Sequence, residues 1–521
     1  MNFRFVICQL GSLLLVLSLC MAAVALWAGW QWWGGAAEEW AALAALGISL
    51  GVGVVAAAGL LLGARRPGLE YLGRREALLL VALSWLLGAA LAGLPYWVWT
   101  QLNTDIITSH EFLSFASCYF EAMSGLTTTG ATVLGGEAGH RIMDLPRGLL
   151  LWRSLTHWLG GVGIVVLFVA VLPTLGVGGK RIFQVESPGP KSMGMRPRIT
   201  ETARILWLIY LAMTAAAIIA LRLCGLGWFD SVCHSFSMVS TGGLSTRDAS
   251  VGAYDSVAVE VVCMFFMLAA GVNFALYFRL VQGRIRSIGQ DTELRVYIAL
   301  KVGVIIAVTA SLLLAATPIV TTGGGHVESS VWQALRYGAF QTISLHTGTG
   351  FCSADYENWP FFCRAMIISL MFVGGCAGST AGGIKVIRIW IVLKVLVASI
   401  EKTFRPNVVR TLRVGNSVID ADHRLASVVY FLTILLLFGL GTFAIMVTEP
   451  SGGRCDFQTA MSATISTLSN VGPGLHEVGA TKNYAWFTGS SKCILSILMC
   501  LGRLELYAIF VLFLPRFWYQ A

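Results

Sequence analysis

The sequence is short of charged residues. Asp, Glu, Lys and Arg make up only 12% of its 521 residues, whereas 56% are hydrophobic. A soluble domain usually carries roughly 25% charged residues. This composition excludes an ordinary soluble protein, and it predicts a multi-span α-helical membrane protein.

Motifs of catalytic and metal-binding chemistry are also missing. The 12 cysteines form no C-x-x-C pair and the 8 histidines form no ligand pattern. No Walker, H-E-x-x-H or nucleophile–base signature occurs, and the predicted cytoplasmic loops are too short for a nucleotide-binding domain. We therefore predict no enzyme and no nucleotide bound by this chain. A disulfide between Cys352 and Cys363 stays open and is not predicted.

Ten apolar runs have the length needed to cross a bilayer. They fall at 5–28, 41–63, 77–100, 148–173, 204–224, 256–281, 294–316, 362–400, 425–447 and 489–515. The first run follows Arg4 and admits a cleaved signal peptide, but it is longer than a typical signal core, which favours a retained helix.

The net charge of +9 comes without a concentrated basic domain, which argues against nucleic-acid binding. Instead, alternate connections between the runs are basic. They contain Arg65, Arg66, Arg74 and Arg75; Lys180, Arg181, Lys191, Arg196 and Arg198; Arg279, Arg284 and Arg286; and Lys402, Arg405, Arg410 and Arg413. The positive-inside rule places these loops and both termini in the cytoplasm of a multi-pass protein of the cell (inner) membrane.

The outward connections of the last four hairpins share a pattern. Each has a half-length apolar stretch, then a Ser/Thr/Gly cluster, then a polar tail. The stretches are SFASCYFEAMSGLTTTGATV, SVCHSFSMVSTGGLST, ALRYGAFQTISLHTGTGF and FQTAMSATISTLSNVGPG, and we align their glycines as Gly130, Gly242, Gly350 and Gly472. Ordinary extracellular turns are the alternative. Four copies, each after a stretch too short to span, favour re-entrant pore loops lining a water-filled path.

The predicted fold is all-α and integral to the membrane. It has ten transmembrane helices, arranged as an N-terminal hairpin and four pseudo-symmetric helix–pore loop–helix repeats around one pore. The predicted boundaries are 1–75 for the hairpin and 76–202, 203–293, 294–424 and 425–521 for the repeats.

The residue types of the four clusters suit a monovalent cation. Backbone carbonyls must replace the water that such an ion sheds in a narrow filter. Glycine reaches the required backbone angles without steric cost. No ring of carboxylates occurs at the aligned positions, which argues against a divalent-cation site.

The run from 362 to 400 is too long for one straight span. Its middle, GGCAGSTAGG, is rich in glycine, which costs up to about 1 kcal/mol per site in a helix. A flexible kink is one interpretation. We favour an irregular gate loop that lies across the pore below the filter. Its residues are Gly374, Gly375, Cys376, Ala377, Gly378, Ser379, Thr380, Ala381, Gly382 and Gly383.

Ionisable residues inside the predicted pore domain are functional candidates. Arg503 is predicted to face the pore and to form part of the permeation barrier; the alternative is that it neutralises Glu505 or a carbonyl group. Lys492 lies on nearly the same face of that helix. Glu121 is assigned a structural role. Asp230 and Asp456, near the starts of two pore helices, are predicted caps.

The motifs TTTGATV, STGGLST, TGTGF and SNVGPGL resemble the four filter segments of the Trk/Ktr/HKT potassium transporters. The N-terminal hairpin and the closing GRLELY are similar to the TrkH/TrkG branch. The resemblance implies a K⁺-selective filter, since a serine at the Gly130 position goes with Na⁺ in some plant members. The coordinating positions that it implies are Thr128, Thr129, Gly130, Ser240, Thr241, Gly242, Gly348, Thr349, Gly350, Asn470, Val471 and Gly472. His346 and Gly348 depart from the plainer residues expected there.

The resemblance also implies an intramembrane gate, a homodimer with one pore per protomer, and a TrkA-like cytoplasmic partner with nucleotide-binding RCK domains. K⁺ is then the transported ion, and membrane lipid surrounds the chain. Two rival functions stay open. They are K⁺ transport coupled to H⁺ or Na⁺ and, less favoured, symport of an organic solute.

Overall fold

The computed structural model describes residues 1–64, 73–103, 107–135, 141–161, 163, 199–408, 411–415, 417–450 and 452–519. Its first two helices, α1 (Phe3–Trp33) and α2 (Glu39–Gly63), form the predicted N-terminal hairpin. They pack closely where α1 carries Gly11, because a Cβ there would lie 3.0 Å from the carbonyl oxygen of Ala57.

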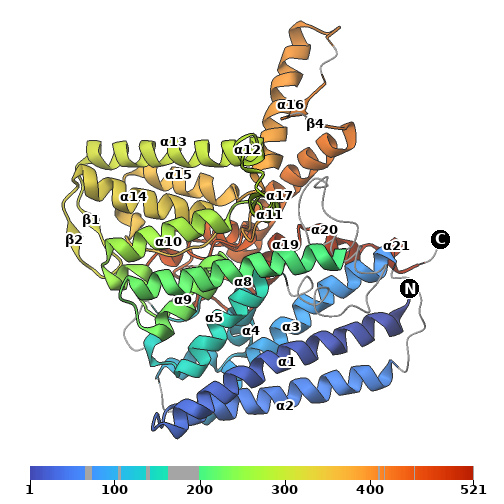
Figure 1. The fold of residues 1–521 in the computed structure, drawn as a ribbon, viewed down its shortest axis with the longest axis vertical. Helices are drawn as coiled ribbons and strands as arrows, with labels where there is room; N and C mark the ends of the chain where they lie inside the picture. Colours follow the sequence, from blue (N-terminus) through green and yellow to red (C-terminus); the bar gives the residue numbers. More distant parts are fainter. Residues whose placement is uncertain are drawn as a thin grey trace.

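Four units follow, each with a long helix, then a short helix, then one or two further helices (Figure 1). Unit 1 contains α3 (Arg74–Leu102), α4 (Phe115–Leu126) and α5 (Arg147–Gly161). Unit 2 contains α8 (Ile199–Leu223), α9 (Trp228–Val239), α10 (Val257–Ala270) and α11 (Phe274–Val281). Unit 3 contains α13 (Thr292–Ala315), α14 (Val331–His346), α15 (Phe361–Phe372) and α16 (Val386–Phe404). Unit 4 contains α17 (Ala421–Thr448), α18 (Phe457–Leu468), α19 (Gly489–Arg503) and α20 (Tyr507–Phe510).

The remaining elements are short connections. The helices are α12 (Ile285–Gly289), α21 (Pro515–Trp518), η1 (Ile107–Phe112), η2 (Ile142–Asp144), η4 (Ser250–Tyr254), η5 (Tyr356–Asn358), η6 (His476–Val478) and η7 (Val511–Phe513). Two antiparallel pairs of strands join β1 (Ile319–Val320) to β2 (His326–Val327) and β3 (Arg413–Val414) to β4 (Ser417–Val418).

The helix that follows the long first helix in each unit cannot cross a bilayer, because it has too few residues. Helices α4, α9 and α18 have 12 residues each and α14 has 16, against the roughly 20 that a span requires. Because each is followed by a turn and not by a continued helix, each enters the fold and stops inside it. The predicted half-length stretches are therefore helices of the expected length.

Two predicted spans are wrong as single helices. The run 256–281 bends by 93° between α10 and α11, and the run 489–515 bends by 115° between α19 and α20. At the second break, Glu505 and Leu506 have φ of 52° and 69°, a left-handed conformation that no α-helix continues. The run 362–400 is interrupted at residues 373–385, as predicted. The second half of the predicted span 148–173, together with the basic residues between 180 and 198, lies outside the described residues.

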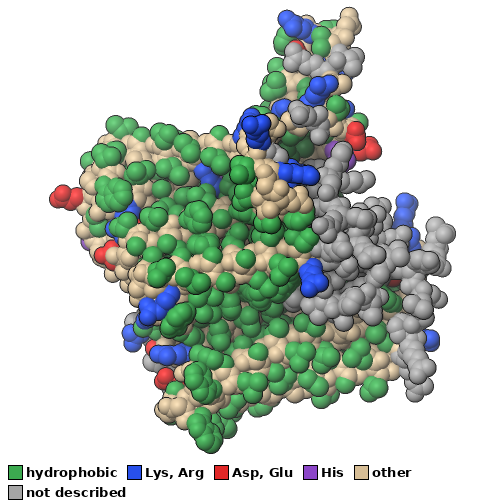
Figure 2. Space-filling model, viewed as in Figure 1, with side chains coloured by type: hydrophobic (Ala, Val, Ile, Leu, Met, Phe, Trp, Pro, Cys, Tyr) green, Lys and Arg blue, Asp and Glu red, His purple; other side chains and the backbone are tan. Residues whose placement is uncertain are grey.

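Six helices in the described part of the chain are long and apolar enough to cross a membrane, or up to eight if each bent pair counts as one span. Figure 2 shows apolar side chains over most of the face formed by α8, α10 and α13. Both ends of the chain lie together. The amide of Asn2 donates to Glu76, and Arg75, in the same turn of α3, donates to the carbonyl of Tyr519.

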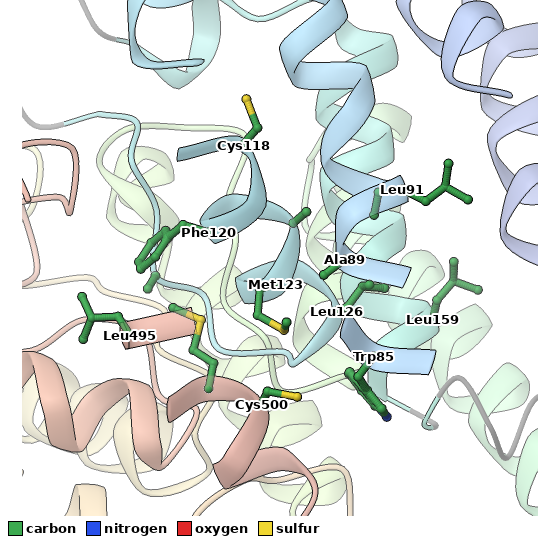
Figure 3. Packing of buried hydrophobic residues seen from close by; sticks show 14 of the residues in the cluster. Trp85, Ala89, Leu91, Cys118, Phe120, Met123, Leu126, Leu159, Leu495 and Cys500 are labelled. Atoms are coloured by element: carbon green, nitrogen blue, oxygen red, sulfur yellow. The ribbon is translucent and has the colours of Figure 1, made fainter. Parts of the chain in front are cut away.

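The short helix α4 lies in the centre of the largest apolar cluster. Figure 3 shows Phe120 and Met123 of α4 between α3, which contributes Trp85, and α19, which contributes Leu495. All four of these side chains are fully buried. Since lipid is as apolar as these groups, close packing and not exclusion from water stabilises their association. The candidate site begins at the C-terminal end of α4.

Candidate functional site

All four short helices end in the same turn. The residue after each C-cap, Thr128, Thr241, Gly348 or Asn470, has φ between 53° and 73°. The next amide donates back across the turn to a serine carbonyl. These bonds join Thr129 to Ser124 at 2.9 Å, Gly242 to Ser237 at 2.7 Å, Thr349 to Ser344 at 2.9 Å and Val471 to Ser466 at 2.9 Å. This is the Schellman arrangement, which stops a helix and releases the chain in an extended direction.

The segments that leave these turns meet each other in a closed ring. A Cβ on Gly130 would overlap the carbonyl oxygen of Gly242 in unit 2. In the same way, a Cβ on Gly243 would overlap the carbonyl oxygen of Thr349 in unit 3, and a Cβ on Gly350 would overlap that of Val471 in unit 4. The last contact returns to unit 1, where a Cβ on Gly472 would lie 2.6 Å from the carbonyl oxygen of Thr129. The predicted convergence of four loops on one axis therefore agrees with the geometry.

The structure corrects one position of the predicted alignment. The glycines with equivalent backbone are Gly130, Gly243, Gly350 and Gly472, with φ of 82°, 80°, 78° and 99°. The same four line one cavity of about 70 Å³ on the outer side of the ring. Gly242 instead corresponds to Thr129, because each donates the helix-ending hydrogen bond of its unit. The sequence STGGLST offered two adjacent glycines, and spacing could not distinguish them.

The turn explains the two unusual residues of the third segment. Gly348 occupies the left-handed position after α14, where glycine has no steric cost. His346, the last residue of α14, is fully buried, and its Nδ1 lies 3.0 Å from Nζ of Lys301 on α13. The sequence analysis did not single out Lys301. A lysine within the apolar run 294–316 is nevertheless a signal of a functional or structural role.

Hydroxyl groups hold part of the ring from outside. The carbonyl of Gly472 accepts hydrogen bonds from Tyr484 at 2.8 Å and from Ser466 at 2.6 Å. Asn470 donates through Nδ2 to Oγ1 of Thr129 at 2.9 Å, which joins the fourth segment to the first. These bonds fix main-chain positions that would otherwise depend on flexible glycine and serine residues.

A buried ion pair fixes the first two segments. Glu121 of α4 accepts from the hydroxyl of Thr132 at 3.0 Å and from the amide of Val133 at 2.9 Å. Arg153 of α5 donates to Glu121 at 2.6 Å and to the carbonyl of Ser245 in unit 2 at 2.8 Å. The structural role predicted for Glu121 agrees with these contacts. Its partner Arg153 was missed, although an arginine within a predicted span is a signal.

His157 of α5 makes a second bridge between units 1 and 2. Its Nε2 accepts from the amide of Leu244 at 3.2 Å, so its Nδ1 carries the proton and donates to the carbonyl of Gly125 at 2.7 Å. Arg336 of α14 similarly binds Glu260 of α10 through two bonds of 2.8 Å, which joins units 2 and 3. Units 1 and 2, and units 2 and 3, are thus tied by polar contacts that are buried or partly buried.

The two predicted caps have different outcomes. Asp456 is the N-cap of α18 and accepts from the amide of Thr459 at 2.8 Å. Asp230 is not a cap, because Gly227 occupies that position of α9. Asp230 instead binds Arg247 at 3.1 Å and Thr246 at 2.7 Å. Partial burial would raise the pKa of Asp230, but these hydrogen bonds hold it below its usual value.

The interhelix loop, residues 373–385, lies directly against the inner end of the ring. A Cβ on Gly382 would overlap the carbonyl oxygen of Ser469, and its amide lies near Gly348. The loop folds on itself, with Gly374 against the carbonyl of Gly382. Glycine is required at such close approaches of backbone to backbone. The predicted gate residues thus lie beside the turns that begin the third and fourth segments, and their role as a gate stays a prediction.

Arg503 at the end of α19 binds carbonyl groups on two units. It donates to Thr380 of the interhelix loop at 2.7 Å and to Gly160 and Gly161 of α5 at 2.7 Å and 3.1 Å. Glu505 pairs with Arg388 at 2.6 Å. The bonds to carbonyl groups place the guanidinium between the interhelix loop and α5, and the role of Arg503 in the permeation barrier stays a prediction.

The remaining candidates are Lys492 and the pair of Cys352 and Cys363. Lys492 donates to Ser117 at 2.9 Å and to the carbonyl of Ala485 at 2.7 Å, so it ties α19 to α4. Cys352 and Cys363 are both buried free thiols. In the part of the chain that the structure describes, no three His, Cys, Asp or Glu residues come together as metal ligands.

Comparison with known proteins gives consistent matches. A family model described as TrkH, cation transport protein, matches residues 95–519. The chain is 37% identical to the Trk system potassium uptake protein TrkH of Halomonas elongata, over 99% of this chain and 100% of that protein. It is 33% identical to TrkG of Escherichia coli over 87% of each chain. It also superposes on the crystal structure of the potassium transporter TrkH from Vibrio parahaemolyticus with a TM-score of 0.83 and 32% identity, covering 100% of both chains.

Proposed function

Because this chain belongs to the TrkH family of cation transport proteins, we propose that it takes up K⁺ through a selective pore with a gate inside the membrane. The observation that carries the proposal is the closed ring of main-chain contacts among Gly130, Gly243, Gly350 and Gly472 and their neighbours. Four non-equivalent segments on one axis offer carbonyl oxygens that can replace the water of a monovalent ion.

The proposed ion-binding residues are the predicted ones, with Gly243 added and Gly472 treated separately. In units 1, 3 and 4 the two residues before each ring glycine supply carbonyl and hydroxyl oxygens, and in unit 2 the three residues before Gly243 do so. The Gly472 carbonyl already accepts two hydroxyl hydrogen bonds, so we assign this glycine a steric role. Its lack of a side chain lets the first and fourth segments approach each other.

The interhelix loop is the proposed gate. It lies against Gly348 and Ser469 at the inner end of the ring, and Arg503 crosses the same space. A positive charge there lowers the occupancy of K⁺ below the filter. The closed form that we propose therefore has a steric component, the loop, and an electrostatic component, the arginine.

The remaining parts of the proposal concern the cellular setting. Both termini lie on the cytoplasmic side of the inner membrane, as the basic connections favour. The protein forms a homodimer, and a TrkA-like cytoplasmic protein regulates it by docking on basic inner loops such as the one with Arg279, Arg284 and Arg286. The chain itself has no enzymatic role.

Uptake of K⁺ by a transport-deficient cell tests the proposal. Cells that express the chain should grow at low K⁺, and alanine at each ring glycine should abolish that growth at unchanged membrane levels. A chain that restores no K⁺ uptake would overturn it. Reversal potentials at varied Na⁺ and pH separate a channel from K⁺ transport coupled to H⁺ or Na⁺, because coupling moves the potential away from that of K⁺ alone.

A further inference from the structure

The interhelix loop is held from two sides by side chains of opposite charge. Arg503 of α19 donates to the carbonyl of Thr380 at 2.7 Å. Glu293 of α13 accepts from the amide of Ala377 at 2.7 Å, three residues earlier in the loop. The first contact lies within the permeation barrier described above. The second comes from a different helix and belongs to no function assigned so far.

The contacts of Glu293 join the loop to the helix that follows it. The same oxygen, Oε1, also accepts from the amide of Ile387, in the first turn of α16, at 3.3 Å. Hydrogen bonds to an ionised carboxylate are among the stronger ones in proteins. The loop is also held by main-chain bonds to the break between α10 and α11, where the amide of Cys376 donates to Gly271 at 2.9 Å and the carbonyl of Gly378 accepts from Phe274 at 3.0 Å. Glu293 is thus one of several anchors, and it is the acidic one, on the side of α13.

Glu293 is not needed to begin its own helix. Asp291 is the N-cap of α13, and its side chain accepts from the amide of Leu294 at 2.9 Å. Glu293 is in the first turn and turns its carboxylate to the loop. The two carboxylates therefore have separate roles. Asp291 caps α13, and Glu293 contacts the loop.

The same face of α13 continues toward the ring. One turn after Glu293, Tyr297 lies against Gly271 at the break between α10 and α11, and its hydroxyl donates to the carbonyl of Leu268 at 3.2 Å. One turn further, Lys301 reaches His346 at the end of α14. Positions four apart share a helix face. The cytoplasmic end of α13 is thus connected to both the loop and the ring.

We propose that Glu293 is a positioning residue for the gate, which holds the interhelix loop in its closed position from the cytoplasmic end of α13. This inference rests on the proposed function of the loop. It predicts that loss of the Glu293 charge releases the loop while the ring, and with it the choice between K⁺ and Na⁺, stays intact.

The test combines flux with the accessibility of a native thiol. Cys376 precedes Ala377 in the loop and is 1% exposed. Its alkylation by N-ethylmaleimide in membranes, measured on its peptide by mass spectrometry, reports opening of the loop without any transport. Rubidium tracer uptake by the same cells reports flux. Glu293→Gln keeps an acceptor oxygen and removes the charge, Glu293→Ala removes both, and Asp291→Asn is the matched control.

We expect Glu293→Gln to raise both the alkylation rate and the rubidium flux by about tenfold, because an amide oxygen accepts a weaker hydrogen bond than a carboxylate does. Glu293→Ala should raise them further, whereas Asp291→Asn should change neither. The Rb⁺ over Na⁺ preference should stay unchanged. If Glu293→Gln is absent from the membrane, Glu293→Asp, which is too short to reach the loop, replaces it.

Unchanged alkylation and flux at normal membrane levels would overturn the inference, and so would a loss of ion preference, because the ring would then depend on Glu293. Failure of the proposed function looks different. In that case the parent chain takes up no rubidium, while faster alkylation of Cys376 in Glu293→Gln would still support the anchor.

Discussion

Gly130 of the first unit lies so close to the carbonyl oxygen of Gly242 in the second that a methyl group on it would overlap that oxygen. The contact belongs to a ring in which each unit touches the next through its main chain. Because the partners are backbone atoms, no side-chain rotation can relieve an added group. The ring therefore depends on glycine for space as well as for backbone angles.

Serine at position 130 should lower the preference for K⁺ over Na⁺. Its side chain must displace the Gly242 carbonyl, and an L-residue with φ of 82° costs roughly 1–2 kcal/mol. We expect the K⁺/Na⁺ flux ratio to fall by about tenfold. Gly59→Ser is the control, since nothing lies within 4 Å of a Cβ there. An unchanged ratio in Gly130→Ser would contradict the filter assignment.

The two adjacent glycines of the second segment should differ in tolerance. Gly243 has φ of 80° and faces the Thr349 backbone. Alanine at this position must adopt an unfavourable φ, and its methyl group must also displace the carbonyl oxygen of Thr349. Gly242 has no positive φ, so alanine there meets a single obstacle, the ring of His157, which two hydrogen bonds hold in place. We expect Gly243→Ala to abolish K⁺ uptake and Gly242→Ala to retain part of it. The reverse order, at equal membrane levels, would favour the alignment based on Gly242.

Alanine at position 503 should raise K⁺ flux. Arg503 makes three hydrogen bonds to carbonyls of the interhelix loop and of α5, and bonds to a charged group contribute roughly 1.5–3 kcal/mol each. Their loss frees the loop and removes a positive charge from the ion path. Tracer uptake should increase by about tenfold or more. Arg516→Ala, in α21, is the control, and a lower flux in Arg503→Ala would exclude the barrier role.

The buried pair of Glu121 and Arg153 should be strongly coupled. Removal of one partner leaves an uncompensated buried charge, which costs roughly 3–5 kcal/mol. We expect Glu121→Gln and Arg153→Met each to lower the thermal unfolding temperature in detergent and to weaken K⁺ preference. The double variant should lose less than the sum of the two. Simple additivity of the two losses would show that the residues act independently.

Much of this architecture follows from one-dimensional patterns. Long apolar runs and four half-length stretches were sufficient to predict the N-terminal hairpin and the short helices, because bilayer thickness and backbone hydrogen bonding allow few alternatives. Glycine density likewise predicted an irregular segment at 374–383, which lies inside the observed interruption at residues 373–385. These features are local, so a single sequence contains them.

Contacts between units were decided only by tertiary structure. Nothing near position 293 in the sequence indicates that its carboxylate meets the amide of Ala377, and nothing near Arg153 indicates that it joins Glu121 to Ser245. The choice between Gly242 and Gly243 also depended on the neighbouring backbone. Residue types and spacing describe what one helix or turn can do, whereas a ring of four different segments exists only when packing brings their main chains into contact.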